Sequence, residues 1–294
     1  MIVIISKNSE VGVPVRKIST DRIKDNLYDI LLEMNCTLSM DIQKCIHDSV
    51  QEEASPIGQN ILQQIEKNIK IANEKKTPLC QDTGMVIVFL EIGQEVQFQG
   101  DYIEDALQEG IKCAYEEGYF RKSIVADPLN RVNTKDNTPG IIHYQIVKGD
   151  GVKMTVMAKG FGSENMSAIA MLKPSDGVQG IKTFIIDTVK AAGSNACPPL
   201  FIGVGIGGTF EKCALLAKKA LARDTKEQHP QEKYAQLEKE LLGNINALGI
   251  GPMGMGGKIT ALGLKIETCA THIAGLPVAV NICCHVNRHK TVVL

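Results

Sequence analysis

The segment that decides the fold is PLCQDTG, Pro78–Gly84, which is followed directly by MVIVFLEIG, Met85–Gly93. The second segment is almost entirely apolar and comes after a turn-like sequence, as is typical of a buried β-strand. The first segment carries a thiol, an amide, a carboxylate and a hydroxyl on consecutive positions, Cys80 to Thr83. We therefore predict a loop, rich in reactive groups, that leads from a helix into a strand.

A long helix is predicted just before this loop. Ser55 followed by Pro56 is an N-cap and first-turn signal. Isoleucines then recur at four-residue spacing on the way to Lys75, at Ile57, Ile61, Ile65 and Ile69. This spacing places them on one face of a helix. We expect one domain of class α/β over residues 1–294, with a helical N-terminal segment to about residue 77 and a mixed α/β part over about residues 78–294.

The α/β part contains further local signals. Asp101 opens a second predicted helix, and Thr209 caps another that runs to Ala222. The polar run from Arg223 to Lys233 is interpreted as a solvated loop. Apolar or alternating segments predict strands at Val152–Ala158, Leu200–Ile206, Ile259–Glu267 and Pro277–Ile282.

The composition favours a small-molecule partner. The 294 residues are 44% hydrophobic and 22% charged, which is an ordinary globular profile. With 32 basic and 33 acidic residues, the chain has no electrostatic field to hold nucleic acid or an anionic membrane. The apolar run Met1–Ile5 is too short for a secretion signal or a membrane span. We expect a cytoplasmic protein that binds neither nucleic acid nor membrane.

The nine cysteines are expected to be free thiols in a reducing compartment. Cys80, Cys197 and Cys284 lie in loops or at element ends beside proline or polar residues, and they are candidate metal ligands. Their wide separation excludes a local zinc motif, and spacing alone leaves open whether they share one site. The remaining cysteines are interpreted mainly as small buried hydrophobes.

The segment GVGIGG, Gly203–Gly208, satisfies the G-x-G-x-x-G pattern of dinucleotide-binding loops. Two observations oppose that interpretation. The acidic residue expected about 20 positions later falls in the charged run, at Asp224, and Cys197–Pro199 crowd the preceding turn. A nucleotide-binding oxidoreductase remains an alternative, and in either case the glycines indicate a close approach to the backbone.

A family resemblance adds to these patterns. Its segments are PLCQDTG, YFRKSIVADPLNRVNTKDNTP, AKGFGSENMS, NACPPLFIGVGIGG, GIGPMGMGGKITALGLKIE and THIAGLPVAVNICCHVNRH. In this order, and over most of the chain, they resemble the alpha subunit of class I iron-sulfur fumarate hydratases and the related tartrate dehydratases. The resemblance implies a hydro-lyase with an oxygen-sensitive 4Fe-4S cluster.

The resemblance places the cluster ligands at Cys80, Cys197 and Cys284. Three thiolates leave one iron open as a Lewis acid, whereas four would close the cluster. Cys283 and Cys284 are adjacent after a strand-like run, so their side chains point to opposite sides and only one is expected to reach the cluster. Cys284 stands directly at the family's C-H-x-x-R-H pattern, which implies that Cys283 packs as a small hydrophobe.

The resemblance also implies substrate-side roles. Asp82 would transfer a proton, and Arg121 would clamp a carboxylate through its planar fork. The resemblance implies further substrate contacts from the side chains of Gln81 and His272. It also implies that the substrate approaches the backbone at Gly160 and Gly162.

The implied reaction is the reversible hydration of fumarate to L-malate. DNTPGIIHY and KGFGSENMS favour this branch over the alternative, an L-tartrate dehydratase. Single-chain members carry a second domain with further catalytic groups after the last cysteine motif, whereas this sequence ends at RHKTVVL. We therefore expect a separate beta subunit that completes the active site, and pairing of the alpha chain with itself. A non-catalytic iron-sulfur scaffold or electron carrier remains a further alternative.

Overall fold

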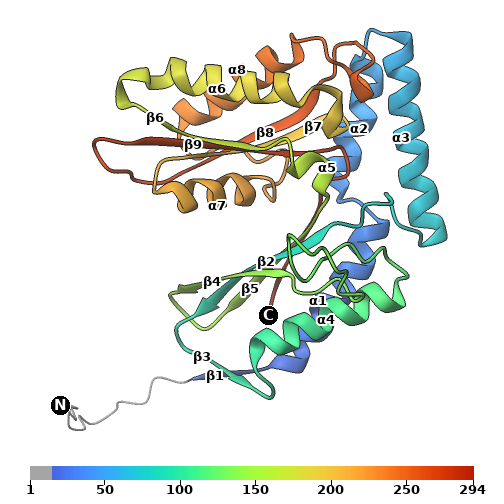
Figure 1. The fold of residues 1–294 in the computed structure, drawn as a ribbon, viewed down its shortest axis with the longest axis vertical. Helices are drawn as coiled ribbons and strands as arrows, with labels where there is room; N and C mark the ends of the chain where they lie inside the picture. The colour runs from blue at the N-terminus through green and yellow to red at the C-terminus, as the bar shows by residue number, and fades with distance from the viewer. Residues whose placement is uncertain (1–14) are drawn as a thin grey trace.

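The computed structural model describes residues 15–294 and has two lobes (Figure 1). Each lobe is built around a four-stranded sheet, and the helices α2 (Met40–Glu52) and α3 (Pro56–Lys75) stand along one side. The predicted mixed α/β class with helices at its beginning is confirmed. The apolar run Met1–Ile5 lies outside the described residues. Within them, no helix combines the length and apolarity needed to cross a bilayer.

The first lobe has the strand order β10-β5-β2-β4. Strand β5 is antiparallel to both of its neighbours, and β4 is the parallel edge strand. Helices α1 and α4 cover one face and share a buried apolar core with the sheet. A short parallel pair, β1 and β3, lies beside them. The bounds are β1 Arg16–Ser19, α1 Thr20–Cys36, β2 Met85–Gly93, β3 Val96–Gln99, α4 Ile103–Glu117, β4 Ile141–Val147, β5 Val152–Lys159 and β10 Arg288–Val293.

The second lobe has the strand order β6-β9-β7-β8. Figure 1 shows α6 and α8 on one face of this sheet and α7 on the other. The bounds are α5 Phe161–Glu164, β6 Ala168–Leu172, η1 Pro174–Asp176, α6 Gly177–Ala192, η2 Gly193–Ala196, β7 Leu200–Ile206, α7 Phe210–Ala220, α8 Glu232–Asn246, η3 Pro252–Gly254, β8 Ala261–Thr268 and β9 Leu276–Cys283. The predicted strand Leu200–Ile206 is confirmed residue for residue, and the predicted helix after Thr209 ends two residues early.

Helix α3 connects the helical beginning to both lobes. It starts where the sequence predicted, because the Ser55 hydroxyl accepts a hydrogen bond from the Gly58 amide at 3.3 Å. Its buried face joins an apolar cluster that contains Ile87 of the first sheet and Phe201 of the second. This cluster therefore forms the joint between the lobes.

The glycines of GVGIGG serve helix packing. A Cβ atom on Gly203 would lie 2.1 Å from the Ala217 carbonyl oxygen, and one on Gly205 would lie 2.1 Å from that of Cys213. Both carbonyls belong to α7, which therefore rests directly on β7. The predicted close approach to the glycine backbone is confirmed, and the group that approaches it is helix α7 of the same chain.

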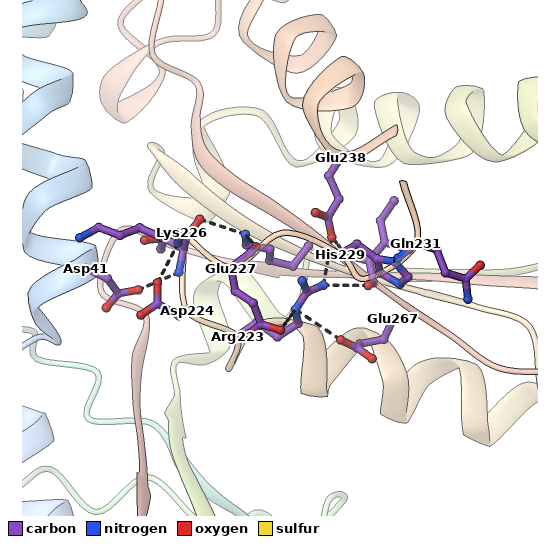
Figure 2. Close-up of polar contacts among 12 residues, drawn as sticks. Asp41, Arg223, Asp224, Lys226, Glu227, His229, Gln231, Glu238 and Glu267 are labelled. Carbon is purple, nitrogen blue, oxygen red and sulfur yellow. Dashed lines mark hydrogen bonds and ion pairs between the residues drawn. The ribbon is translucent and has the colours of Figure 1, made fainter. Parts of the chain in front are cut away.

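The segment Arg223–Lys233 is not simply a solvated loop, which corrects the sequence interpretation. Figure 2 shows Arg223 surrounded by carboxylates, with its Nη1 atom 3.0 Å from Oε1 of Glu238. The Nε atom of Arg223 lies 3.5 Å from carboxylate oxygens of both Glu227 and Glu267. His229 is also buried, edge-on to the Tyr234 ring. A charged side chain can be buried when paired, and the Glu238 and Glu267 partners come from α8 and β8.

Candidate active site

The topology of the second sheet brings two of the candidate ligand cysteines together. Cys197 precedes β7, Cys284 directly follows β9, and these strands are antiparallel with Phe201 opposite Cys283. The start of β7 and the end of β9 therefore lie at the same end of the sheet. His285 completes the contact, because its Nδ1 atom lies 3.2 Å from the Cys197 carbonyl oxygen.

The Cys80 loop is fastened to the same place by a buried arginine. Arg288 is 3% exposed and donates one hydrogen bond to the Asp82 carbonyl oxygen at 2.8 Å and another to the Asn35 side chain at 3.0 Å. Cys80 and Cys284 both border the apolar cluster at the joint between the lobes. Burial, and after it the charge of nearby Cys80, raises the pKa of the Cys197 thiol. Contacts thus connect the loops of Cys80, Cys197 and Cys284 beside the joint between the lobes.

The thiols of Cys80, Cys197 and Cys284 are chemically suited to an iron-sulfur cluster, whose ligands are cysteine thiolates. All nine cysteines are free, and Cys283 is 2% exposed within the apolar core, as predicted. Among residues 15–294, no three His, Cys, Asp or Glu side chains are spaced to hold one metal ion. Three thiols on separate loops are the donor set that such a cluster with one open iron requires.

The carboxylate of Asp82 has a fixed orientation. Its Oδ1 atom accepts a hydrogen bond from the Gly84 amide at 3.0 Å, and its Oδ2 atom accepts one from the Phe161 amide at 2.8 Å. Gly84 has a φ of +79°, and a Cβ atom there would lie 2.8 Å from the Lys159 backbone. Only glycine fits this position, so the turn that aims Asp82 depends on it.

Arg121 and Gln81 lie beside Asp82 on the surface. The Thr83 hydroxyl donates to the Arg121 carbonyl oxygen at 2.8 Å, which holds the two loops together. Asn137 is fully buried and braces both loops, because its side chain donates to the Gly84 carbonyl and accepts from the Ser123 amide. The guanidinium of Arg121 and the amide of Gln81 are exposed. Neither makes a hydrogen bond within residues 15–294, so both are available to a ligand.

Gly160 also belongs to this group. A Cβ atom on Gly160 would lie 3.1 Å from the Oδ2 atom of Asp82, so a larger residue would press on the carboxylate. Gly162, in the same turn, is exposed and faces open space. The structure therefore places Gly160 against the Asp82 carboxylate and the Arg121 backbone against Thr83.

His272 is not brought to this group within one chain. It lies in the connection between β8 and β9, where Thr271 donates to the Gly208 carbonyl at 3.0 Å. Strand β9 has eight residues and therefore spans about 25 Å between this connection and Cys284. The imidazole is exposed, and its Nδ1 atom accepts a hydrogen bond from the Ala274 amide.

Sequence reasoning missed two buried cations that support the site, Arg288 and Lys159. Lys159 is 1% exposed and contacts Ser163 and Glu164 in the turn that holds Asp82. Both residues stood inside the quoted family segments. A lysine that closes an apolar strand beside glycine was the available signal.

Comparison with known proteins identifies the family. The family described as Fumarate hydratase (Fumerase) matches residues 24–293 of this chain. The chain belongs to the fumarate hydratase family. The predicted resemblance is therefore confirmed, and the chain is a hydro-lyase family member whose family implies an iron-sulfur cluster.

Relatives within the fumarate hydratase family carry a more specific description. A protein of Methanocaldococcus jannaschii is 44% identical over 273 residues, which cover 91% of this chain and 95% of the relative. It is provisionally described as an L(+)-tartrate dehydratase subunit alpha. The L(+)-tartrate dehydratase subunit alpha of Escherichia coli O157:H7 is 30% identical over 281 residues, 92% of this chain and 91% of the relative. That of Escherichia coli K12 is 29% identical with the same coverage.

Proposed function

We propose that this chain is the alpha subunit of an iron-sulfur hydro-lyase that acts on a four-carbon dicarboxylate. The proposal is supported by two contacts between these loops: His285, next to Cys284, contacts the Cys197 carbonyl, and Arg288, four residues after Cys284, bonds the Asp82 carbonyl two residues after Cys80. Dehydration of L(+)-tartrate is the first candidate, because the named relatives are tartrate dehydratase subunits. Hydration of fumarate to L-malate, which the sequence segments favoured, is the second, because the family description names that activity.

Cys80, Cys197 and Cys284 would hold a 4Fe-4S cluster as thiolates. When bound, the cluster supplies a Lewis-acidic iron with an open position for the hydroxyl and a carboxylate of the substrate. Burial raises the pKa of Cys197, so this thiol must lose its proton as iron binds. The free thiols are consistent with a reducing compartment, and we propose that the protein functions in the cytoplasm. We also propose that residues 1–294 form one cluster-binding domain.

The protein's own groups would handle the proton and the charge. Asp82 takes the proton from the carbon next to a carboxylate during dehydration and returns it during hydration. Two backbone amides hold it in one orientation, so the positions of its oxygen atoms are set before a substrate binds. The unpaired fork of Arg121 clamps the substrate carboxylate, and the Gln81 amide adds a hydrogen bond. The turn Gly160–Gly162 lets the substrate approach the backbone.

A beta subunit would complete the site. Loss of the proton leaves a second negative charge next to the carboxylate, and stabilising it requires more cationic or amide donors than Arg121 and Gln81 provide. The relatives are named as alpha subunits, which supports a second kind of chain. Because His272 lies at the far end of β9, a contact from it to this substrate would have to come from a second alpha chain.

The test uses anaerobically purified alpha chain with and without its beta subunit. We expect a brown protein whose paramagnetic signal changes when substrate is added, and turnover of L-tartrate or L-malate only with both subunits. Fumarate and mesaconate serve as hydration substrates for comparison. A brown complex that is inert to all of them, with no substrate-dependent signal, would indicate an electron carrier or scaffold. A colourless protein that retains a dinucleotide would overturn the proposal in favour of the oxidoreductase alternative.

A further inference from the structure

Lys159 is a buried cation that the proposed reaction does not yet use. It is the last residue of β5, where it stands opposite Met85 of β2, and its side chain is 1% exposed. A buried ammonium group is tolerated only when polar partners replace its hydration. The reason this lysine is buried therefore has to be found in its partners.

Among the described residues 15–294, the hydrogen-bond and ion-pair partners of the ammonium group all lie in the five residues that follow Lys159. The Nζ atom donates to the Gly160 carbonyl oxygen at 3.1 Å and to the Ser163 hydroxyl at 2.8 Å, and it lies 3.3 Å from an Oε2 atom of Glu164. These residues form the single turn α5 and its cap. A turn of this length is not stable by itself, because one or two helical hydrogen bonds do not offset the loss of backbone entropy. Lys159 fastens the turn from inside.

The same turn holds the carboxylate of Asp82. Its Phe161 amide donates to the Oδ2 atom at 2.8 Å, and Gly160 leaves room for that oxygen. The backbone of Lys159 packs against Gly84 on the other side of the Asp82 turn. Lys159 thus contacts both elements that orient the carboxylate, although no contact joins its ammonium group to the carboxylate itself.

Glu164 anchors this arrangement to the second lobe. Its Oε2 atom accepts a hydrogen bond from Asn281 of β9 at 2.9 Å, and its Oε1 atom pairs with Lys218 of α7. Within residues 15–294, Lys218 pairs with Glu164 and makes no hydrogen bond to the backbone of the turn. A Lys218 substitution is therefore a matched control for a Lys159 substitution. Each removes one cation from Glu164, but only the Lys159 substitution removes the hydrogen bonds to Gly160 and Ser163.

We infer that Lys159 is a positioning residue for proton transfer by Asp82, acting through the Gly160–Glu164 turn. This inference rests on the proposed function of Asp82. Displacing a catalytic group by about 1 Å can reduce turnover by about a hundredfold without removing the group. The substrate would still bind through Arg121 and Gln81, so the loss belongs in kcat and not in KM.

The test compares Lys159→Met with Lys218→Met in the complex with the beta subunit. We expect Lys159→Met to lower kcat by about tenfold to a hundredfold, with KM and iron content unchanged. Lys218→Met should keep kcat within about threefold of wild type, as a change outside the positioning contacts. Amide hydrogen exchange of the isolated chain supplies a readout without turnover, since residues 160–164 should exchange faster only in Lys159→Met.

Several outcomes would overturn the inference. Wild-type kcat in Lys159→Met would do so, as would equal losses in both variants or a loss confined to KM. Should Lys159→Met fail to fold, Ser163→Ala decides instead, because it removes one 2.8 Å acceptor and leaves the charge in place. We expect a smaller fall in kcat and faster exchange from Ser163→Ala, and wild-type values would refute the inference. Inactivity of the wild-type complex would instead refute the proposed function.

Discussion

Glu53→Gln should destabilise the chain far more than its conservative chemistry suggests. Glu53 is 1% exposed, and its carboxylate accepts three backbone hydrogen bonds. The Oε1 atom bonds the amides of Ser55 and Lys258 at 2.8 and 2.9 Å, and the Oε2 atom bonds that of Ile259 at 2.8 Å. This residue therefore ties the start of α3 to the segment before β8.

The magnitude follows from the geometry of an amide. However a glutamine is oriented, its NH2 group must face at least one of these backbone amides, so two donors oppose each other in a buried place. A hydrogen bond to a charged group contributes about 1.5–3 kcal/mol, and an unpaired buried donor costs a similar amount. We expect a loss of about 3 kcal/mol in the free energy of unfolding. For a chain of this size, that loss corresponds to a fall of roughly 5–10 °C in Tm.

The acid dependence of stability provides a second readout. Burial raises the pKa of Glu53, but the backbone hydrogen bonds outweigh it and leave the pKa below its ordinary value of 4.5. A group with a lowered folded-state pKa stabilises the fold above its unfolded value and loses that contribution as the pH falls through the folded pKa. Wild type should therefore lose more stability than Glu53→Gln when the pH is lowered below about 4.5.

Thermal unfolding between pH 3 and pH 7 measures both effects. Glu52→Gln is the matched control, because Glu52 is the exposed neighbour and its substitution should change Tm by less than about 2 °C. A Tm for Glu53→Gln within that same limit at pH 7 would refute the reasoning. Equal acid sensitivity of the variant and wild type would refute the pKa argument separately.

Three further changes test the site and the fold. Asp82→Asn should keep its iron but lower kcat by roughly 10²–10⁴, because it removes the general base, and near wild-type turnover with a full cluster would make Asp82 structural only. After anaerobic reconstitution, Cys284→Ala should lose most iron and all activity while Cys283→Ala retains most of both, and the reverse pattern in an iron assay would move the ligand by one residue. Gly205→Ala should lower the free energy of unfolding by about 1–3 kcal/mol or more, because the added methyl group would meet the backbone of α7. Gly243→Ala is the control: it faces open space in α8 and should be neutral or stabilising. A denaturant titration measures both.

The sequence by itself determined the elements whose causes are local. Ser55, Pro56 and the isoleucine spacing located α3 to the residue, because a cap and a helical period act within a few positions. The apolar run Leu200–Ile206 located β7 for the same reason. Local signals also placed Cys80, Cys197 and Cys284 outside the helices and strands, but they missed Cys269, which was interpreted as a buried hydrophobe and is exposed after β8.

Tertiary structure decided which of these segments meet. Cys197 and Cys284 converge because β7 and β9 are antiparallel, and Arg288 reaches the Asp82 loop across 206 positions of sequence. The length of β9 separates His272 from that site, which no motif could reveal. Arg223 is largely shielded from solvent, with its side chain 9% exposed, and distant elements supply two of its carboxylate partners. Strand pairing and the burial of charged side chains depend on partners far apart in the chain, so local sequence patterns do not predict them.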